Sequence, residues 1–316
     1  MKKFEDVNIL VVGDIMLDKY VVGEVERISP EAPVPIVHVS EEYSTLGGCG
    51  NVVRNIRSLG PQVTCLASVA NDLAGDQILK YLSELNVNAE IIAGSHVTIV
   101  KERIVAGERK TQMLRVDREI PFGIDPELSI NAIRGLDTMF DVVVVSDYNK
   151  GLVSSELMDY LRSKYDKIII DPKPANSYTY GRVFMMTPNE KEWNTMMAMT
   201  PWKVEADYFL VTKGKKGMQL IDARDPDRDN WSMTEISARP VEIFNVSGAG
   251  DTAVAVLATC YASGFSLKES SIIANECAGW VVTQPGTTTI ERDIFEDIFA
   301  HSKFQKKFNS LMEDPS

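Results

Sequence analysis

The sequence predicts an α/β fold, in which helices cover a doubly wound, mostly parallel sheet that carries a small β-sheet lid. Two observations predict it. Short, unbroken apolar runs recur along the chain and end on polar residues; such runs are typical of strands buried on both faces, as in parallel sheets. Two further β-prone stretches, one proline-rich and one rich in Lys and Arg, interrupt this rhythm, and prolines at that density are typical of edge strands.

The buried strands are expected at five places, namely residues 7–12, 142–145, 168–170, 184–186 and 208–211. Polar residues follow each run, among them Asp14, Asp147 and Thr212. In sheets of this kind, ligands bind beyond the carboxyl ends of the strands. We therefore expect these side chains to line a ligand-binding edge.

The β-prone stretches lie at about residues 16–42 and 96–118. We expect them to pair as a small antiparallel flap over the strand ends, where it would act as a lid. No linker rich in Gly, Ser or Pro divides the chain, so residues 1–316 are expected to form a single domain.

Composition excludes several classes of protein. The 316 residues are 44% apolar and 25% charged, which is average for a globular protein and excludes collagen-like, disordered and disulfide-scaffold chains. A net charge of −12 without a dense Lys/Arg run argues against nucleic acid as a partner. Neither a signal peptide nor an apolar stretch near the ~18 residues of a membrane span is found. A cytoplasmic location, with no membrane partner and four free thiols, is expected.

The strongest motif covers residues 245–252, where small residues precede a helix-forming stretch. Gly248, Ala249 and Gly250 would leave backbone N–H groups bare at the start of that helix, and Asp251 would lie in its first turn. Such amides bind a phosphate or the charge that develops in phosphoryl transfer. The alternative is that Asp251 only caps the helix, but a cap does not need three small neighbours.

The same stretch also matches the dinucleotide-binding pattern G-x-G-x-x-A. That interpretation, a dehydrogenase, is disfavoured because no good strand precedes the motif and no acidic residue ends a strand about 20 residues later. The P-loop pattern G-x-x-x-x-G-K-[ST] does not occur in the chain, which excludes a P-loop enzyme.

A second glycine cluster contains Gly47, Gly48 and Asn51 and opens another predicted helix. Bare backbone beside an amide side chain suits sugar hydroxyls, which need paired donors and acceptors at close range; an ordinary turn is the alternative. Asp14 and Asp18 add two carboxylates after the first strand, again suited to hydroxyls, although Asp14 could equally serve the turn itself.

Residues 47–51 and 245–251 together resemble the two signatures of the ribokinase-like (PfkB) family of sugar kinases, and the resemblance covers essentially the whole chain. Within that family, residues 145–151, 171–173, 187–192 and 284–287 look most like the bacterial heptose 7-phosphate kinases. Those enzymes make heptose 1,7-bisphosphate for the inner core of lipopolysaccharide. Many are fused to a nucleotidyltransferase, but here only the kinase activity is expected.

The resemblance implies a role for each matching position. Asp251 corresponds to the catalytic base, and the amides of residues 248–250 correspond to the anion hole. The expected sugar-binding and substrate-binding residues are Asp14, Asp18, Gly47, Gly48, Asn51, Arg115, Asp147 and Lys173. The expected ATP-binding residues are Asn189, Thr212, Gly214, Gly217, Asn275 and Gly279, with Glu192 placing Mg²⁺ through water.

One position departs from the family signature. The signature begins with an Asp that commonly helps to hold a monovalent cation, and this chain has Asn245 there. A dependence on K⁺ is therefore in doubt, while the base Asp251 is intact.

We thus expect a MgATP-dependent kinase that acts on a sugar phosphate, most simply heptose 7-phosphate, and forms a homodimer. A phosphorylated substrate needs local cations, and Lys173, Arg103, Lys110 and Arg115 are candidates; lid cations that are merely solvated are the alternative. Two other functions stay open: a kinase for another sugar, such as ribose or fructose 6-phosphate, and a non-catalytic sugar or nucleotide sensor.

Overall fold

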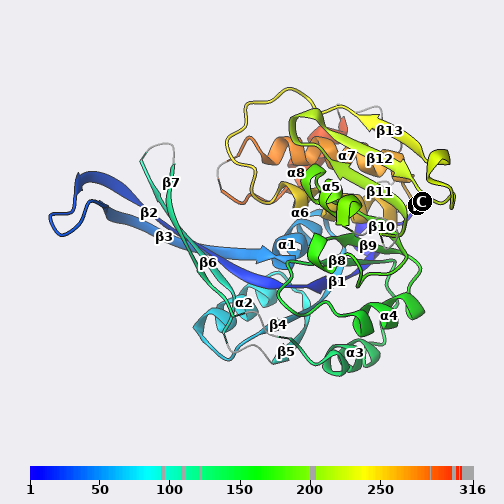
Figure 1. Cartoon of the computed structure of the whole chain (residues 1–316), viewed down its shortest axis with the longest axis horizontal. Helices are drawn as coiled ribbons and strands as arrows, with labels where there is room; N and C mark the ends of the chain where they lie inside the picture. The colour runs from blue at the N-terminus through cyan, green and yellow to red at the C-terminus, as the bar shows by residue number, and fades with distance from the viewer. Residues whose placement is uncertain are drawn as a thin grey trace, which may run out of the picture.

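The structure is a computed structural model, and it describes residues 1–93, 97–107, 111–120, 123–199, 204–284, 286–300, 304–305 and 307. Within these residues the strands form a nine-stranded main sheet and a four-stranded sheet that projects from it (Figure 1). The order of the main sheet is β13-β12-β11-β10-β9-β8-β1-β4-β5. Its strands are β1 (Asn8–Gly13), β4 (Gln62–Val69), β5 (Asn88–Ala93), β8 (Val142–Ser146), β9 (Ile168–Asp171), β10 (Val183–Met186), β11 (Ala206–Thr212), β12 (Met218–Asp222) and β13 (Ser232–Ile236).

Neighbouring strands of the main sheet run parallel from β5 across to β11. At the other edge, β12 pairs antiparallel with β11, and β13 pairs antiparallel with β12. The five apolar runs that we expected to be buried strands are β1, β8, β9, β10 and β11. The predicted fold class, a mostly parallel α/β sheet with a lid, is confirmed.

Helices cover both faces of the main sheet. They are α1 (Cys49–Leu59), α2 (Leu73–Glu84), α3 (Pro126–Arg134), α4 (Ser155–Lys164), α5 (Glu190–Met199), α6 (Ala249–Ala262), α7 (Leu267–Val281) and α8 (Arg292–Ala300). Short 3-10 helices are η1 (Phe4–Asp6), η2 (Pro174–Asn176), η4 (Gly214–Lys216) and η5 (Arg228–Asn230).

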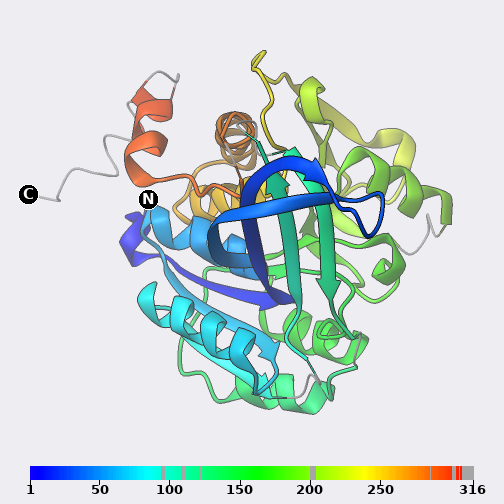
Figure 2. The same cartoon turned by 90° about the vertical axis from the view of Figure 1, so that its left-hand side faces the viewer.

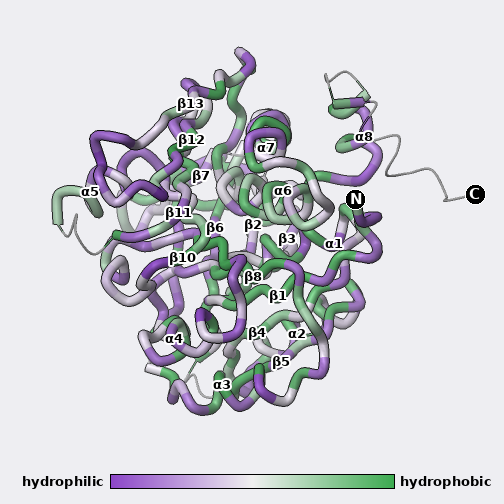
Figure 3. Tube along the Cα trace, turned by 90° about the vertical axis from the view of Figure 1, so that its right-hand side faces the viewer, coloured by the Kyte–Doolittle hydropathy of each residue, from purple (hydrophilic) through white to green (hydrophobic). Residues whose placement is uncertain are grey.

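Two hydrophobic cores lie on opposite faces of the main sheet, because successive side chains of a strand point to opposite sides. Ile9 and Val11 pack with α1, α2, α6, α7 and α8, while Leu10 and Val12 pack with α3, α4 and α5. Figure 3 shows the hydrophobic colouring that runs along β1 and β8 in the centre of the molecule. Burial on both faces is why these strands are apolar without interruption.

The second sheet forms the lid, with the order β3-β2-β6-β7. Its strands are β2 (Ile15–Ile28), β3 (Pro35–Gly48), β6 (Val100–Ala106) and β7 (Thr111–Arg118). It extends from the main sheet as a long arm in Figure 1 and crosses the front of the molecule in Figure 2. The expected lid stretches, 16–42 and 96–118, correspond to these strands, except that residues 96 and 108–110, including Lys110, lie outside the described residues.

The expectation of an antiparallel lid is wrong for one pair of strands. β2 pairs with β3, and β6 with β7, in the antiparallel sense, but the central pair β2–β6 is parallel. The reason lies in the connections: β2 follows β1, β6 follows β5, and both preceding strands run in the same direction in the main sheet. Both strands therefore enter the lid in the same direction.

The described residues contain no helix that is long and apolar enough to cross a membrane. Cys49, Cys65, Cys260 and Cys277 are all buried with free thiols, as expected.

A buried polar network around Asn55 fastens α1 to α6. Asn55 Nδ2 donates to the carbonyl oxygen of Asn51 at 2.8 Å, within α1. Asn55 Oδ1 accepts hydrogen bonds from Thr252 Oγ1 on α6, at 3.2 Å, and from the backbone N–H of Ile290, at 3.1 Å. Because Asn55 and Thr252 are fully buried, water cannot replace these bonds.

We expect Asn55→Ala to lower the free energy of unfolding by about 2–4 kcal/mol, because it leaves the Thr252 hydroxyl and the Ile290 N–H buried without acceptors. The control is Asn131→Ala, since Asn131 is exposed and its side chain accepts a hydrogen bond from Arg134 in the same helix; this change should cost less than about 0.5 kcal/mol. Denaturant unfolding of both variants measures the difference. Equal stabilities would contradict the importance of the network.

Candidate active site

A glycine turn begins α6 at the edge where the parallel strands end. Gly248 has φ 82°, in the left-handed region, and a Cβ there would lie 2.8 Å from Asn51 Nδ2 and 2.9 Å from Thr287 Cγ2. A side chain at this position would therefore be strained and would also clash. A Cβ on Gly250 would meet no atom of the described residues within 4 Å, so that side of the turn is open. The expected glycine turn that opens a buried helix is confirmed.

Asp251 lies in the first turn of α6 and is only 6% exposed. Its Oδ2 accepts a hydrogen bond from Asn51 Nδ2 at 2.8 Å, and its Oδ1 accepts one from the Tyr148 hydroxyl at 2.9 Å. Burial raises the pKa of Asp251 to about 6, although these two hydrogen bonds and the charge of Lys173 favour the carboxylate. A carboxyl with this pKa is ionised at neutral pH and can still accept a proton.

A cavity of about 160 Å³ opens beside Asp251. It is lined by Tyr148, Asp171, Lys173, Thr187, Asn189, Glu192, Thr212, Gly248, Gly250 and Asp251. These residues come from the ends of β8, β9, β10 and β11 and from the starts of α5 and α6. The cavity therefore occupies the edge where the sequence predicts a ligand.

Within this cavity, charges of both signs lie close together. Lys173 Nζ pairs with Glu192 Oε1 at 2.7 Å and lies 5.1 Å from the centre of the Tyr148 ring. Burial raises the pKa of Asp171 to about 8, with Lys173 opposing the shift and Asp251 adding to it. A cation bound nearby would favour the ionised carboxylate and lower this pKa.

Glu192 and Asn189 fix each other at the start of α5. The backbone N–H of Asn189 donates to Glu192 Oε2 at 3.0 Å, and that of Glu192 donates to Asn189 Oδ1 at 2.9 Å. This reciprocal capping orders both side chains at the wall of the Asp251 cavity. It leaves Glu192 Oε1 for Lys173.

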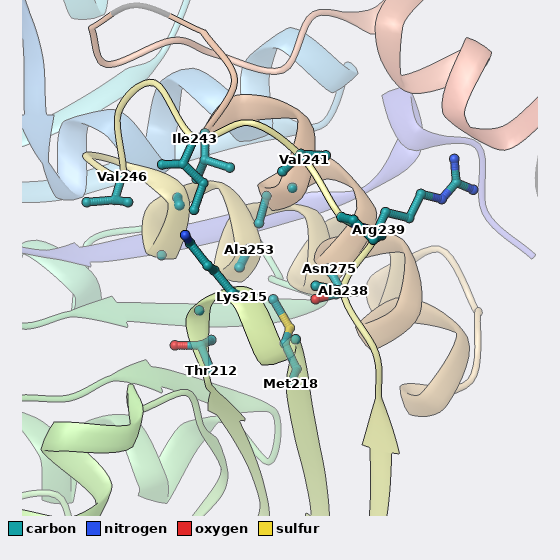
Figure 4. A pocket seen from close by; sticks show the side chains of 18 residues that line it. Thr212, Lys215, Met218, Ala238, Arg239, Val241, Ile243, Val246, Ala253 and Asn275 are labelled. Carbon is teal, nitrogen blue, oxygen red and sulfur yellow. The ribbon is translucent and has the colours of Figure 1, made fainter.

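A larger cavity of about 410 Å³ adjoins the first and shares Thr212 and Gly250 with it. Figure 4 shows its lining, in which Met218, Ala253 and Ile243 supply apolar surface. Five of the residues predicted to bind ATP line it, namely Thr212, Gly214, Gly217, Asn275 and Gly279; the sixth, Asn189, lines the Asp251 cavity. An apolar slot that opens beside exposed backbone amides suits a nucleotide, with its base in the slot and its phosphates at the turn.

The residues predicted to bind sugar gather at the base of the lid. Asp14 is buried, and its Oδ2 accepts hydrogen bonds from the backbone N–H groups of Tyr148 at 2.9 Å and Lys150 at 3.0 Å. Burial and the charge of Asp147 raise the pKa of Asp14 to about 6. Asp18 Oδ1 pairs with Arg103 at 2.6 Å.

The glycines beside these carboxylates are required by space. A Cβ on Gly47 would lie 2.6 Å from Asp18 Oδ2. Gly48 has φ 59°, and a Cβ there would lie 2.3 Å from the carbonyl oxygen of Asp14. The last residue of this predicted set, Asn51, follows at the start of α1 and is fully buried.

Of the eight predicted substrate residues, only Lys173 lines the Asp251 cavity itself. Two of the others, Asp147 and Arg115, are engaged by protein groups. The carboxylate of Asp147 accepts from the backbone N–H of Asn149 and from the side chains of Asn176 and Tyr180, at 2.6–2.8 Å. Arg115 pairs with Asp117 on the same lid strand.

Three residues of the cavity, Tyr148, Asp171 and Thr187, were not among the predicted site residues. All three follow predicted buried strands, so their positions gave a signal. The signal was incomplete because a strand end presents several polar residues, and local sequence does not say which side chain turns inward.

The amide of Asn245 is occupied by neighbouring backbone. Its Oδ1 accepts from the N–H of Ser247 at 2.9 Å, and its Nδ2 donates to the carbonyl oxygen of Gly286 at 3.1 Å. Asn245, the residue that departs from the family signature, thus links two loops beside the glycine turn.

Comparison with solved structures identifies the fold. Phosphofructokinase-2 from Escherichia coli, solved in complex with potassium, superposes with a TM-score of 0.75 over 95% of this chain and 99% of its own, at 17% identity. Ribokinase from Thermotoga maritima superposes with a TM-score of 0.71 over 93% of this chain and 100% of its own, also at 17% identity. At that identity the likeness concerns the fold alone.

Comparison of sequences reaches closer relatives. The bifunctional protein HldE of Hydrogenovibrio crunogenus is 33% identical over 99% of this chain and 67% of its own length. The HldE of Desulfatibacillum aliphaticivorans is 36% identical over 92% of this chain and 62% of its own length. This chain thus spans about two thirds of such relatives. Residues 7–293 match the description "pfkB family carbohydrate kinase", and the chain therefore belongs to the pfkB family of carbohydrate kinases.

Proposed function

We propose that this kinase transfers the γ-phosphoryl group of ATP to the 1-hydroxyl of heptose 7-phosphate, giving heptose 1,7-bisphosphate, a precursor of the lipopolysaccharide core. Kinases of this family use ATP, and the HldE relatives cover nearly the whole chain. The observation that carries the proposal is the position of Asp251. Its buried carboxylate lies at the glycine turn, in a cavity that adjoins a nucleotide-sized one.

In the proposed reaction, Asp251 accepts the proton of the attacking hydroxyl, and the charge on the transferring group is stabilised by the amides of Gly248, Ala249 and Gly250. General-base catalysis of this kind is worth roughly 10²–10⁴-fold. The amides are aligned before the reaction begins, because the turn of Gly248 and the first turn of α6 hold them, so their stabilisation needs no reorganisation.

The acidic groups of the Asp251 cavity fit a magnesium ion that is held mainly by other ligands. Among the described residues, no three His, Cys, Asp or Glu side chains lie close enough to hold a metal by themselves. Glu192 and Asp171 nevertheless line the cavity with oxygen donors, which Mg²⁺ prefers, together with waters and substrate phosphates. When bound, the ion would neutralise charge on the ATP phosphates.

The sugar hydroxyls would meet Asp14, Asp18, Asn51 and the bare backbone of residues 47–48. We predicted that Lys173 binds the substrate; its pairing with Glu192 beside Asp251 supports a narrower role at the phosphoryl group in transfer. Asp147 and Arg115 are held by protein groups in this structure. We infer that they keep the neighbouring loops in place and do not bind the sugar directly.

We also propose that residues 1–316 act as one domain and that the protein forms a homodimer. Val34 and Val39 at the end of the lid, and Leu114 on β7, are apolar side chains that are more than half exposed. Such surface on a lid is available to a second copy.

The proposed function is tested by offering ATP with a panel of sugars and sugar phosphates and measuring the product by mass spectrometry. The panel contains heptose 7-phosphate, fructose 6-phosphate, ribose and the parent heptose. A bisphosphate formed fastest from heptose 7-phosphate supports the proposal. If ribose or fructose 6-phosphate is phosphorylated faster, the protein is a kinase for that sugar. If no sugar is phosphorylated, the alternative of a non-catalytic sensor is supported.

We expect Asp251→Asn to reduce kcat at least about a hundredfold, because the amide cannot accept the proton. Affinities for sugar and ATP should stay within a few-fold of the unmutated values. The control is Asp76→Asn, which removes an exposed carboxylate from the first turn of α2 and should leave kcat unchanged. If Asp251→Asn keeps more than about a tenth of kcat, Asp251 acts as a helix cap and not as the base.

The pH dependence of kcat should report the pKa of Asp251. Because the base works as the carboxylate, activity should rise with pH through about 6. Tyr148→Phe removes a hydrogen bond that favours the carboxylate, so the rise should move to higher pH by about one unit. Tyr178→Phe, at an exposed tyrosine, should leave the profile in place. A shift to lower pH with Tyr148→Phe would refute this role for the hydroxyl.

Potassium should activate the enzyme weakly or not at all, since Asn245 is neutral and its amide oxygen already accepts from Ser247. Asn245→Asp should increase the response. The measurement is a titration with KCl against choline chloride at equal ionic strength. A strong requirement for K⁺ in the unmutated protein would show that backbone carbonyls are sufficient to hold the cation.

A further inference from the structure

One face of the lid sheet carries charged side chains that turn toward the active site. In the lid register, Lys101 on β6 lies between Asp18 on β2 and Asp117 on β7. Arg103 is two residues further along β6 and so shares its face. Arg103 bonds Asp18, and Lys101 Nζ lies 5.2 Å from the centre of the Tyr148 ring. This face of the lid therefore faces the residues that surround Asp251.

Most cations at this place are already neutralised by a carboxylate. The pairs are Arg103–Asp18 at 2.6 Å, Arg115–Asp117 at 2.8 Å, Lys150–Glu119 at 2.7 Å and Lys173–Glu192 at 2.7 Å. Lys101 differs: among the described residues no carboxylate lies within salt-bridge distance of its Nζ, which instead lies over the Tyr148 ring. It is also partly buried. A half-buried ammonium without a counter-ion is uncommon.

The surroundings of Lys101 disfavour its charge in the absence of an anion. Burial lowers its pKa, and the nearby charges of Lys150 and Arg115 lower it further, while Asp18 and Glu119 oppose the shift. An anion bound beside Lys101 would favour the charged ammonium in two ways: it would pair with the buried ammonium, and it would offset the repulsion from Lys150 and Arg115.

The anion that suits Lys101 does not belong to the nucleotide. The nucleotide cavity is lined from β11, β12, α6, α7 and the segments between them, and Lys101 is not part of its wall. Lys101 instead reaches in from the lid, across the Tyr148 ring, whose hydroxyl contacts Asp251 Oδ1 at 2.9 Å. One aromatic side chain thus separates the ammonium from the base. A sugar with one hydroxyl at Asp251 could place a distal phosphate at Lys101.

We propose that Lys101 binds the phosphate that the sugar substrate already carries, with Arg115 and Lys150 adding positive potential, and that this contact selects phosphorylated over unphosphorylated sugars. The inference rests on the proposed function, since it deepens the assignment of a sugar phosphate as substrate. It makes Lys101 a determinant of specificity. It also gives a protein of net charge −12 a local site for a dianion.

The test measures binding by calorimetry, without turnover, for heptose 7-phosphate, the parent heptose and ATP. Lys101→Met keeps the length of the side chain and removes the charge. Loss of a charge-assisted phosphate contact should weaken binding of heptose 7-phosphate about ten- to a hundredfold. Binding of heptose and of ATP should change less than about threefold. Lys101→Arg should recover most of the loss.

The matched control is Lys19→Met on the opposite face of the same sheet, where Lys19 pairs with Glu42 and Glu102. It removes the same charge from the lid and should leave all three affinities unchanged. Thermal unfolding of each variant checks that the lid is intact. The proposal is overturned if Lys101→Met weakens heptose and heptose 7-phosphate equally, if it weakens ATP instead, or if Lys19→Met has the same effect.

The outcome also separates this inference from the assignment of heptose. If the unmutated protein binds another phosphosugar, such as fructose 6-phosphate, more tightly than heptose 7-phosphate, the heptose assignment fails. The same comparison is then made with that sugar and its unphosphorylated parent, and a selective loss in Lys101→Met still supports the role of Lys101. If the unmutated protein binds no phosphosugar better than its parent, the role of Lys101 is refuted while a sugar kinase remains.

Discussion

The hydrogen bond from Asn51 to Asp251 is the contact on which the rest of the site depends. It joins α1, which follows the sugar-facing glycines, to α6, which presents the anion-binding amides. The same amide group occupies the space that a Cβ on Gly248 would need. One buried side chain therefore orients the base, demands the glycine turn and holds two helices in register. Asn55, one turn further along α1, adds a second tie to α6 through Thr252.

Sequence predicted the centre of the fold better than its edges. The five unbroken apolar runs were recognisable because β1, β8, β9, β10 and β11 are covered on both faces. β4 and β5 were not predicted: Thr64 and Ser68 interrupt the apolar pattern of β4, and β5 is largely half-exposed at the edge of the sheet. The direction of β2 against β6 could not be read locally either, because it follows from how distant strands are connected.

In the site, the predictions succeeded where backbone geometry dictates the residue. Gly248 stands out in the sequence because only glycine suits its conformation, and Asp251 stands out because it follows that turn. Tyr148 and Lys101 acquire their properties from burial among groups far away in the chain, which no local pattern records. Asp147 illustrates the converse, since a strand-end carboxylate that suggested a ligand is held by the loop that follows β9.

On its β2–β3 side the lid is joined to the rest of the molecule by very short connections. Only Asp14 separates the end of β1 at Gly13 from the start of β2 at Ile15, and β3 ends at Gly48, next to the first residue of α1. A movement of the lid is therefore transmitted as mechanical strain to Asp14 at one end and to the start of α1 at the other, since hinge motion must be absorbed by the residues at the ends of the moving elements. Asn51 lies two residues into that helix. The lid, the sugar-binding carboxylate Asp14 and the helix that carries Asn51 are thus mechanically coupled through the shortest possible stretch of backbone, so that a displacement of the lid would reach the partner of Asp251 directly.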